Sequence, residues 1–418
     1  MIKSKSLLEG HGLPGTVYIT FPEVMLATVK NQLINCWQEA FAALHLPYED
    51  EVDAGGTVIK RYLVVDSESL APYHAMASTM MGSSFMNIDI GGGTSDILYV
   101  VKNGGTIVAT YFTSTKFAAN DLWGDGFSVA AGGAALRTNC DNGFKSYMDG
   151  MVTGSGIDLA SQSAYKTFAD QIAKNSADIM GYLFKNDKTF NTEAKIAEQK
   201  NLFSLIFVHY AAVIYNVARI LKKKKLPIPE VLSFTGMGSK YTRLIAPQDA
   251  ELTELTRILL QLFTVTDDQE FPKTFCVKRP GAAKEMTANG ALAVTGLAAG
   301  FVASNPQNVN DYGFDTEQTL TYADVSKDEV RKAVLVEYEH FIDLIRGSQE
   351  FRNYLHSKFA LTICDSLLDD LKNKAEASYN NYSGMAAGHA QVNVTETLFF
   401  WPLKHALYEV SKNYQSYQ

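Results

Sequence analysis

A short segment near residue 90 constrains the fold more than any other part of this chain of 418 residues. Residues 85–90 (FMNIDI) and 96–101 (DILYVV) have the β-branched and apolar composition of strands, and three glycines at positions 91–93 lie between them. A third run of this kind, residues 106–113 (TIVATYFT), follows another glycine pair. We therefore predict an antiparallel meander of three short strands, with a tight glycine turn after the first.

The elements around this meander alternate between strand and helix. Residues 16–21 (TVYITF) and 60–65 (KRYLVV) have strand composition, and residues 23–44 between them carry apolar side chains at helical spacing. This pattern predicts a βαβ unit before the meander. Beyond it, the sequence predicts an inserted helical region, a strand at residues 230–235 turning into a helix at 236–244, a helix at 252–263, a strand at 275–278, a helix at 288–303, and helices from residue 327 to the end.

The glycine turn has the chemistry of a phosphate site. Glycines let backbone N–H groups approach an anion without a Cβ in the way, and Thr94 adds a hydroxyl that could bind a terminal phosphate. Asp89, at the end of the first strand, suits a water-mediated contact with Mg²⁺, which prefers oxygen ligands. Dinucleotide-binding loops and Walker loops are followed by a helix, whereas residues 97–101 have strand composition. The sequence therefore argues against either kind of loop at residues 91–93. The alternative is a plain glycine-rich hairpin.

The string DIGGGTSDI resembles the second phosphate motif of the actin, Hsp70 and sugar-kinase superfamily, and is especially similar to that of Hsp70-, FtsA- and MreB-like members. Four further segments resemble the same superfamily in the expected order: residues 17–22 (VYITFP) with 65–71 (VDSESLA), 116–127 (KFAANDLWGDGF), 231–244 (VLSFTGMGSKYTRL) and 287–292 (TANGAL). The resemblance covers about residues 16–300.

This resemblance implies an α/β, actin-like (ribonuclease H-like) ATPase fold. Residues 1–84 would be a partial first lobe, a βαβ remnant. Residues 85–303 would be a complete second lobe with an inserted helical subdomain at 134–229, and residues 304–418 an added C-terminal helical region. ATP or ADP with Mg²⁺ would be held between the two lobes.

Roles follow from the resemblance only where residues match. Asp89 would organise Mg²⁺, and Glu68 would orient water, which would make both catalytic, although Glu68 could equally be an ordinary acid at a helix N-terminus. Met237 departs from the superfamily's usual double glycine, and Lys240 stands where an arginine is common in Hsp70. The residues implied to bind nucleotide are Gly91, Gly92, Gly93, Thr94, Gly236, Gly238, Ser239 and Lys240.

The superfamily begins with a phosphate hairpin of the Asp-x-Gly-Thr type, and no match to it precedes residue 16. The chain is therefore expected to be the later part of a longer protein or a truncated form, with a natural degenerate relative as the alternative. Half of the clamp for the terminal phosphate would then be missing, so ATP hydrolysis by this chain alone stays undecided.

Composition limits the partners. The chain has 45 acidic and 37 basic residues, a formal charge of −8, which argues against a nucleic-acid backbone as the main ligand. Its four cysteines form no Cys-x-x-Cys pair, and the first ten residues contain no apolar signal core, so we expect a reducing, cytoplasmic location. Residues 202–221 are expected to form a buried helix and not a membrane span, because an arginine and an asparagine interrupt them.

Several sequence features remain open. His209, His340 and His405 lie within apolar helical patterns and are expected to be packed side chains and not metal ligands. The leading hypothesis is an ATP-binding protein, with a non-catalytic pseudo-ATPase scaffold and a filament-forming actin homologue as alternatives. A sugar kinase is least favoured. The C-terminal helices are the expected place for a protein partner or for self-assembly.

Overall fold

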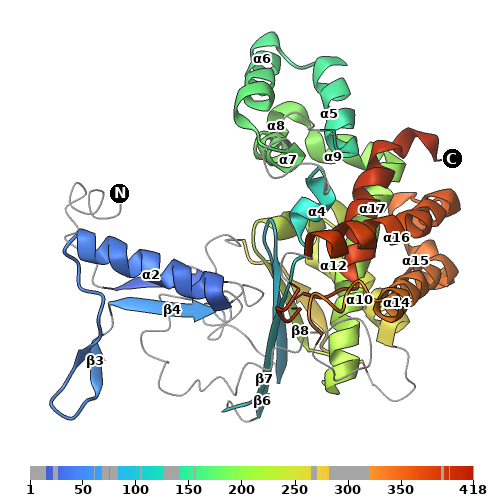
Figure 1. Ribbon diagram of the computed structural model, residues 1–418. Coiled ribbons are helices and arrows are strands. Elements are labelled where there is room, and N and C mark those ends of the chain that lie inside the picture. Colours follow the sequence, from blue (N-terminus) through green and yellow to red (C-terminus); the bar gives the residue numbers. More distant parts are fainter. Residues whose placement is uncertain are drawn as a thin grey trace.

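The computed structural model describes residues 16–21, 27–60, 62–67, 75, 83–103, 106–125, 141–154, 156–264, 271–281, 320–386, 390–394 and 396–417. A five-stranded mixed sheet lies at the centre, with helices packed on one side of it and a small module of strands and a helix on the other (Figure 1). The α/β class predicted from the sequence is confirmed.

The N-terminal module is the βαβ unit that the sequence predicts. Its strands β1 (Val17–Phe21) and β4 (Leu63–Ser67) pair in parallel, and helix α2 (Ala27–Ala43) lies between them in the chain. A parallel pair requires a crossover of this kind. The sequence did not predict the hairpin of β2 (Glu51–Val52) and β3 (Val58–Lys60), which precedes β4.

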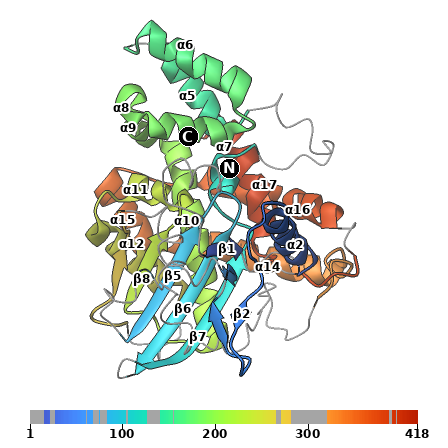
Figure 2. The same cartoon turned by 90° about the vertical axis from the view of Figure 1, so that its left-hand side faces the viewer.

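The central sheet has the strand order β7-β6-β5-β8-β9. The meander of β5 (Ser84–Ile90), β6 (Ser95–Asn103) and β7 (Thr106–Thr115) is antiparallel as predicted. Strand β8 (Val231–Thr235) lies beside β5 and parallel to it (Figure 2). Strand β9 (Cys276–Lys278) pairs with β8, also in parallel. Because β5 and β8 are parallel neighbours, the turns that follow them meet at one edge of the sheet.

The two faces of the sheet differ in chemistry. Along β5, the alternate residues Met86, Ile88 and Ile90 are fully buried in the main hydrophobic core. Asn87, on the opposite face, is also fully buried, and its Nδ2 donates to the hydroxyl of Thr235 on β8 at 3.0 Å. This period of two is the pattern of a strand with both faces covered.

Helix α10 (Lys200–Lys224) is the central helix of the core. Within the described part of the chain, it alone is long and apolar enough to cross a membrane. Protein surrounds it, however, since 94% of its most apolar window is buried, as the sequence predicts. It ends at Lys225, whose φ of 52° is left-handed, with three lysines in its last turn where cations favour the helix dipole.

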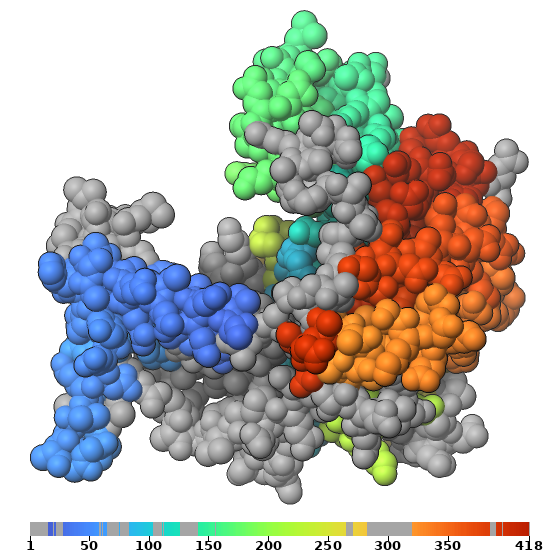
Figure 3. All heavy atoms as spheres, in the orientation of Figure 1, coloured from blue at the N-terminus to red at the C-terminus, as the bar shows by residue number. Residues whose placement is uncertain are grey.

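The inserted helical region projects from the sheet and forms the green part at the top of Figure 3. It follows the short helix α4 (Ala119–Trp123), which leads out of the meander. Its elements are α5 (Gly143–Gly154), α6 (Leu159–Thr167), the π-helical turn η2 (Phe168–Ile172), α7 (Ser176–Lys185), α8 (Asp187–Phe190) and α9 (Thr192–Glu198).

The C-terminal helices share the core of the sheet. Phe399 and Leu403 belong to the same buried cluster as Phe117 and Leu205. This sharing makes the described C-terminal helices an integral part of the sheet-bearing body, while the predicted boundary at residue 304 lies outside the described residues. The helices are α14 (Asp328–Gly347), α15 (Gln349–Phe359), α16 (Asp365–Ala386) and α17 (Phe400–Lys412), followed by the 3₁₀ turn η6 (Tyr414–Ser416).

The three histidines behave differently from one another. His209 is fully buried on α10, and His405 is half-buried on α17 beside Glu409. His340 is exposed on α14, so the expectation that it is packed is wrong. The buried stripe of α14 includes Tyr338 and Phe341, and His340 falls between them in the sequence and outside that stripe.

Candidate functional site

The glycine turn joins β5 to β6 as a tight hairpin. The N–H of Gly91 donates to the carbonyl of Thr94 at 2.9 Å, and Ile90 and Ser95 face each other across the turn. Gly92 and Gly93 are exposed. A strand and not a helix follows Thr94, which confirms the predicted hairpin and excludes a Walker or dinucleotide-binding loop at this position.

A second turn lies directly against the first. After β8, the chain passes through Gly236, whose φ is +81°, into a 3₁₀ turn, η3 (Gly238–Tyr241), and then α11 (Thr242–Ile245). A Cβ on Gly236 would overlap the Asp89 carboxylate and the carbonyl oxygen of Ile90. A Cβ on Gly238 would overlap the carbonyl oxygen of Gly91. Only glycine allows the two turns to approach so closely.

This second turn differs from its prediction in one respect. The sequence predicts a helix over residues 236–244, whereas the chain forms 3₁₀ structure first and one α-helical turn only from Thr242. The hydroxyl of Ser239 donates to the carbonyl of Gly236 at 2.8 Å. A side chain that bonds its own backbone competes with helical hydrogen bonding, which is consistent with the tight turn.

The helix α4 closes the glycine turn from another side. The N–H groups of Ala119 and Asn120 lie 3.3 Å and 2.8 Å from the carbonyl oxygens of Gly91 and Gly92. These bonds hold the outer part of the turn against the first residues of α4. Three chain segments, residues 91–94, 118–121 and 236–241, therefore meet at this edge of the sheet.

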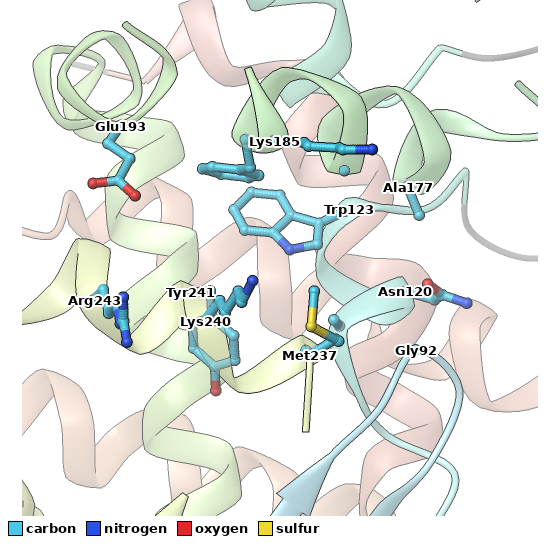
Figure 4. Close-up of a pocket in the computed structure, with 14 residues that line it drawn as sticks. Gly92, Asn120, Trp123, Ala177, Lys185, Glu193, Met237, Lys240, Tyr241 and Arg243 are labelled. Atoms are coloured by element: carbon cyan, nitrogen blue, oxygen red, sulfur yellow. The ribbon is translucent and has the colours of Figure 1, made fainter. Parts of the chain in front are cut away.

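A pocket of about 690 Å³ opens beside these segments (Figure 4). Gly92, Gly238 and Lys240 line it, as do residues of the helical insertion. Glu193 and Arg243 lie on one side of the Trp123 ring, and Asn120 and Gly92 lie on the other (Figure 4). The volume is within the usual range for small-molecule sites.

Aromatic side chains form part of the pocket wall. Trp123 has only 7% of its surface exposed, and its ring centre lies 5.4 Å from that of Phe184 on α7. Met237, by contrast, is 46% exposed at the pocket. Flat apolar surfaces of this kind suit a planar ring.

The charged residues of the pocket are mainly cationic. Among the described residues that line it, Lys185, Lys240 and Arg243 are cationic and Glu193 is the one carboxylate. Burial and the negative charge of Asp187 raise the pKa of Glu193, while Arg243 opposes the shift. Three cations against one anion favour a negatively charged ligand.

The predicted site residues fall into three groups. Gly92, Gly238 and Lys240 line the pocket. Asp89, Gly91, Gly93, Thr94, Gly236 and Ser239 form or abut the two turns without lining it. Glu68 and residues 287–292 lie outside the described residues. The ligand-binding roles of all of them stay predictions.

Asp89 is half-buried at the end of β5, directly across from Asp96 on β6. Among the described residues, no group of three His, Cys, Asp or Glu side chains could hold a metal. Mg²⁺ is usually held by one or two carboxylates together with phosphate oxygens and waters. Asp89 fits that mode as a single protein ligand, whereas an all-protein cage is not built here.

Sequence reasoning missed the part of the pocket that comes from the helical insertion. Lys185 and Glu193 lie on α7 and α9, which the sequence treats only as helices with an interruption near residues 185–192. Gly181, in the middle of α7, lines the pocket, but a single glycine in a helical pattern is too weak a signal to predict it.

No protein-family model and no curated protein matches this chain. Among solved structures, it is similar to the ethanolamine utilization protein EutJ from Carboxydothermus hydrogenoformans, with 16% identity over 69% of this chain and 70% of that one and a TM-score of 0.28. It is also similar to MreB 5 of Spiroplasma citri bound to AMPPNP, with 15% identity over 68% and 69% and a TM-score of 0.30. At these identities and TM-scores, the similarity gives no information about the function of this chain.

Proposed function

We propose that this chain binds ATP or ADP as a member of the actin, Hsp70 and sugar-kinase superfamily. The observation that carries the proposal is the direct contact between the turn at residues 91–94 and the turn that begins at Gly236. The two motifs are far apart in the sequence, and each resembles one half of the superfamily's nucleotide site. A chance glycine-rich hairpin would not require the second motif beside it.

The phosphates would lie at the glycine turn. Gly92 and Gly93 are exposed and carry no Cβ, so a phosphate can approach their backbone N–H groups closely. The pocket beside the turn has two more cationic than anionic side chains, from three cations and Glu193. That excess favours a polyphosphate over a neutral ligand.

The base would lie near η3 in the pocket. Met237 and Lys240 are exposed there, and the Trp123 ring lies across the pocket from them. The superfamily usually has a second glycine where Met237 stands, so the thioether narrows the base site. Lys240 lacks the planar guanidinium of arginine and would contact the base through its charge and stem only.

Asp89 would hold Mg²⁺ through water, and Glu68 would orient an attacking water if ATP is hydrolysed. Mg²⁺ would supply charge neutralisation at the phosphates, while this chain positions them. Binding without turnover, as in a pseudo-ATPase scaffold, is the second candidate. It is favoured by the finding that Asp89 abuts Gly236 and does not line the pocket. A cytoplasmic location remains part of the proposal.

Isothermal titration with ATP tests the proposal. We expect saturable binding that weakens when EDTA removes Mg²⁺ and when Asp89→Ala removes the carboxylate. Asp170→Ala is the matched control, because this acid is exposed on the helical insertion, where it pairs with Lys166 at 2.8 Å. Release of inorganic phosphate measured on the same samples separates an ATPase from the pseudo-ATPase scaffold. Absence of ATP binding by the unmodified chain would refute the proposal.

A further inference from the structure

The position of the glycine turn depends on the segment that precedes and begins α4. The N–H groups of Ala119 and Asn120 hold the carbonyls of Gly91 and Gly92, and a Cβ on Gly92 would lie 3.3 Å from the Oδ1 of Asn120. Any movement of residues 116–121 would therefore move or release the turn. The order of the turn therefore depends on the residues that contact 116–121 on the side away from the turn.

Residues from the C-terminal region fix that other side. The Nζ of Lys116 lies 3.2 Å from the Oε1 of Glu396. The ring of Phe117 stacks on that of Phe400 at the start of α17, with centres 4.2 Å apart and planes 8° apart. These contacts join two parts of the chain that are almost three hundred residues apart.

Glu396 lies at the centre of a charge cluster in which Lys404 is buried and Lys116 has 42% of its side chain exposed. Only 8% of the surface of Glu396 is exposed, and Lys404 of α17, 5% exposed, has its Nζ 3.8 Å from the second carboxylate oxygen. The hydroxyl of Tyr322 also donates to Glu396 at 3.2 Å. Burial would raise the pKa of Glu396, but the positive charges of Lys404 and Lys116 hold it below its ordinary value. The carboxylate is therefore ionised at neutral pH.

Asp121 brings the same cluster to α4. Its carboxylate accepts the N–H of Ala118 at 2.7 Å, which fixes the entry into the helix. Loss of hydration raises the pKa of Asp121 to about 6, while the charge of Lys404 opposes this shift. Two lysines and two carboxylates therefore balance in charge, and removing the charge of Glu396 leaves the buried ammonium of Lys404 less compensated.

We infer that Glu396, although it belongs to the C-terminal helical region, is a positioning residue for the glycine turn, which it holds through Lys116 and the first residues of α4. The inference rests on the proposed function for its effect on nucleotide binding, but not for its effect on the turn itself. On this account, Glu396 and α17 support the nucleotide site from outside the pocket.

Glu396→Gln tests this inference, since the amide keeps the shape and removes the charge. We expect the Kd for MgATP to rise about tenfold or more, within the range of one lost charge-assisted hydrogen bond. Faster amide hydrogen exchange is expected in the nucleotide-free chain at Gly91, Ala119 and Asn120, whose N–H groups are hydrogen-bonded at the turn. Asp343→Asn is the matched control: it breaks the pair with Lys372, at 3.1 Å, within the same C-terminal helices but away from α4.

A second variant tests the inference if Glu396→Gln fails to fold. Phe400→Leu keeps an apolar side chain of similar size and removes the ring stacking on Phe117, so it should raise exchange at the same amides. Unchanged exchange at Gly91, Ala119 and Asn120 in a folded Glu396→Gln or Phe400→Leu protein overturns the inference. Absence of ATP binding by the unmodified chain would instead refute the proposed function and leave the exchange result to decide the inference.

Discussion

Replacing Gly236 by alanine is the sharpest perturbation of the contact between the two turns. The residue has a φ of +81°, and an added Cβ would overlap the Asp89 carboxylate and the Ile90 carbonyl oxygen. Gly156, in the loop before α6, offers a matched control: its φ is +80°, and no described atom lies within 4 Å of an added Cβ. The two variants share the backbone strain and differ in the overlap.

The expected loss of unfolding free energy is the sum of the backbone strain and the steric overlap. A left-handed alanine costs about 1–2 kcal/mol, and this is the whole expected loss for Gly156→Ala. Overlap with atoms that cannot yield without parting β5 from β8 adds about 1–3 kcal/mol in Gly236→Ala. We therefore expect Gly236→Ala to lower the free energy of unfolding by about 2–5 kcal/mol in total.

Urea unfolding followed by circular dichroism measures both losses, and titration with ATP measures their effect on binding. Gly236→Ala should have the lower unfolding midpoint and should bind ATP more weakly, whereas Gly156→Ala should bind it like the unmodified chain. Equal midpoints and equal affinities in the two variants would show that the turns are not in contact as described.

Three further predictions address the pocket and its support. Lys240→Glu and Arg243→Glu should each weaken ATP binding, and more strongly at low than at high salt, because each adds an anion to a pocket with an excess of cations; an affinity independent of salt would argue against phosphate in this pocket. ATP should change the fluorescence of Trp123, and Trp123→Phe should abolish that change; a full response in the variant would place the ligand elsewhere. Burial lowers the pKa of His209 to about 4, so the stability that its neutral form contributes is complete above pH 6.5 and is lost as the pH falls from 6.5 towards 4. Between pH 6.5 and 4, His209→Gln should therefore lose less unfolding free energy than the unmodified chain, by up to about 3 kcal/mol. The control His340→Gln, at an exposed position, should lose as much as the unmodified chain. Parallel acid curves for all three proteins in urea titrations would contradict the assignment.

Local sequence signals predicted the parts of the site that lie on consecutive residues. The alternation in residues 85–101 and the three glycines were sufficient for the hairpin, because strand period and turn chemistry are local properties. The residues at 231–235 likewise formed the predicted strand β8. The pairing of β5 with β8 was not predicted, since no local pattern states which strands become neighbours.

The rest of the site depends on tertiary packing that no window of sequence contains. Lys185 and Glu193 enter the pocket because the helical insertion folds over it. Glu396 supports α4 because α17 packs beside it, and its sequence context shows only an acid in a polar stretch. His340 illustrates the opposite error, because an apolar neighbourhood in the sequence did not settle which face of α14 the side chain occupies.

A crystal structure of the chain with Mg²⁺ and a non-hydrolysable ATP analogue would test the central claim most directly. The account predicts phosphate oxygens within about 3.2 Å of backbone nitrogens in residues 91–94, with the base beside Met237 and Lys240. An analogue bound at another edge of the sheet, with the glycine turn free of phosphate, would contradict it.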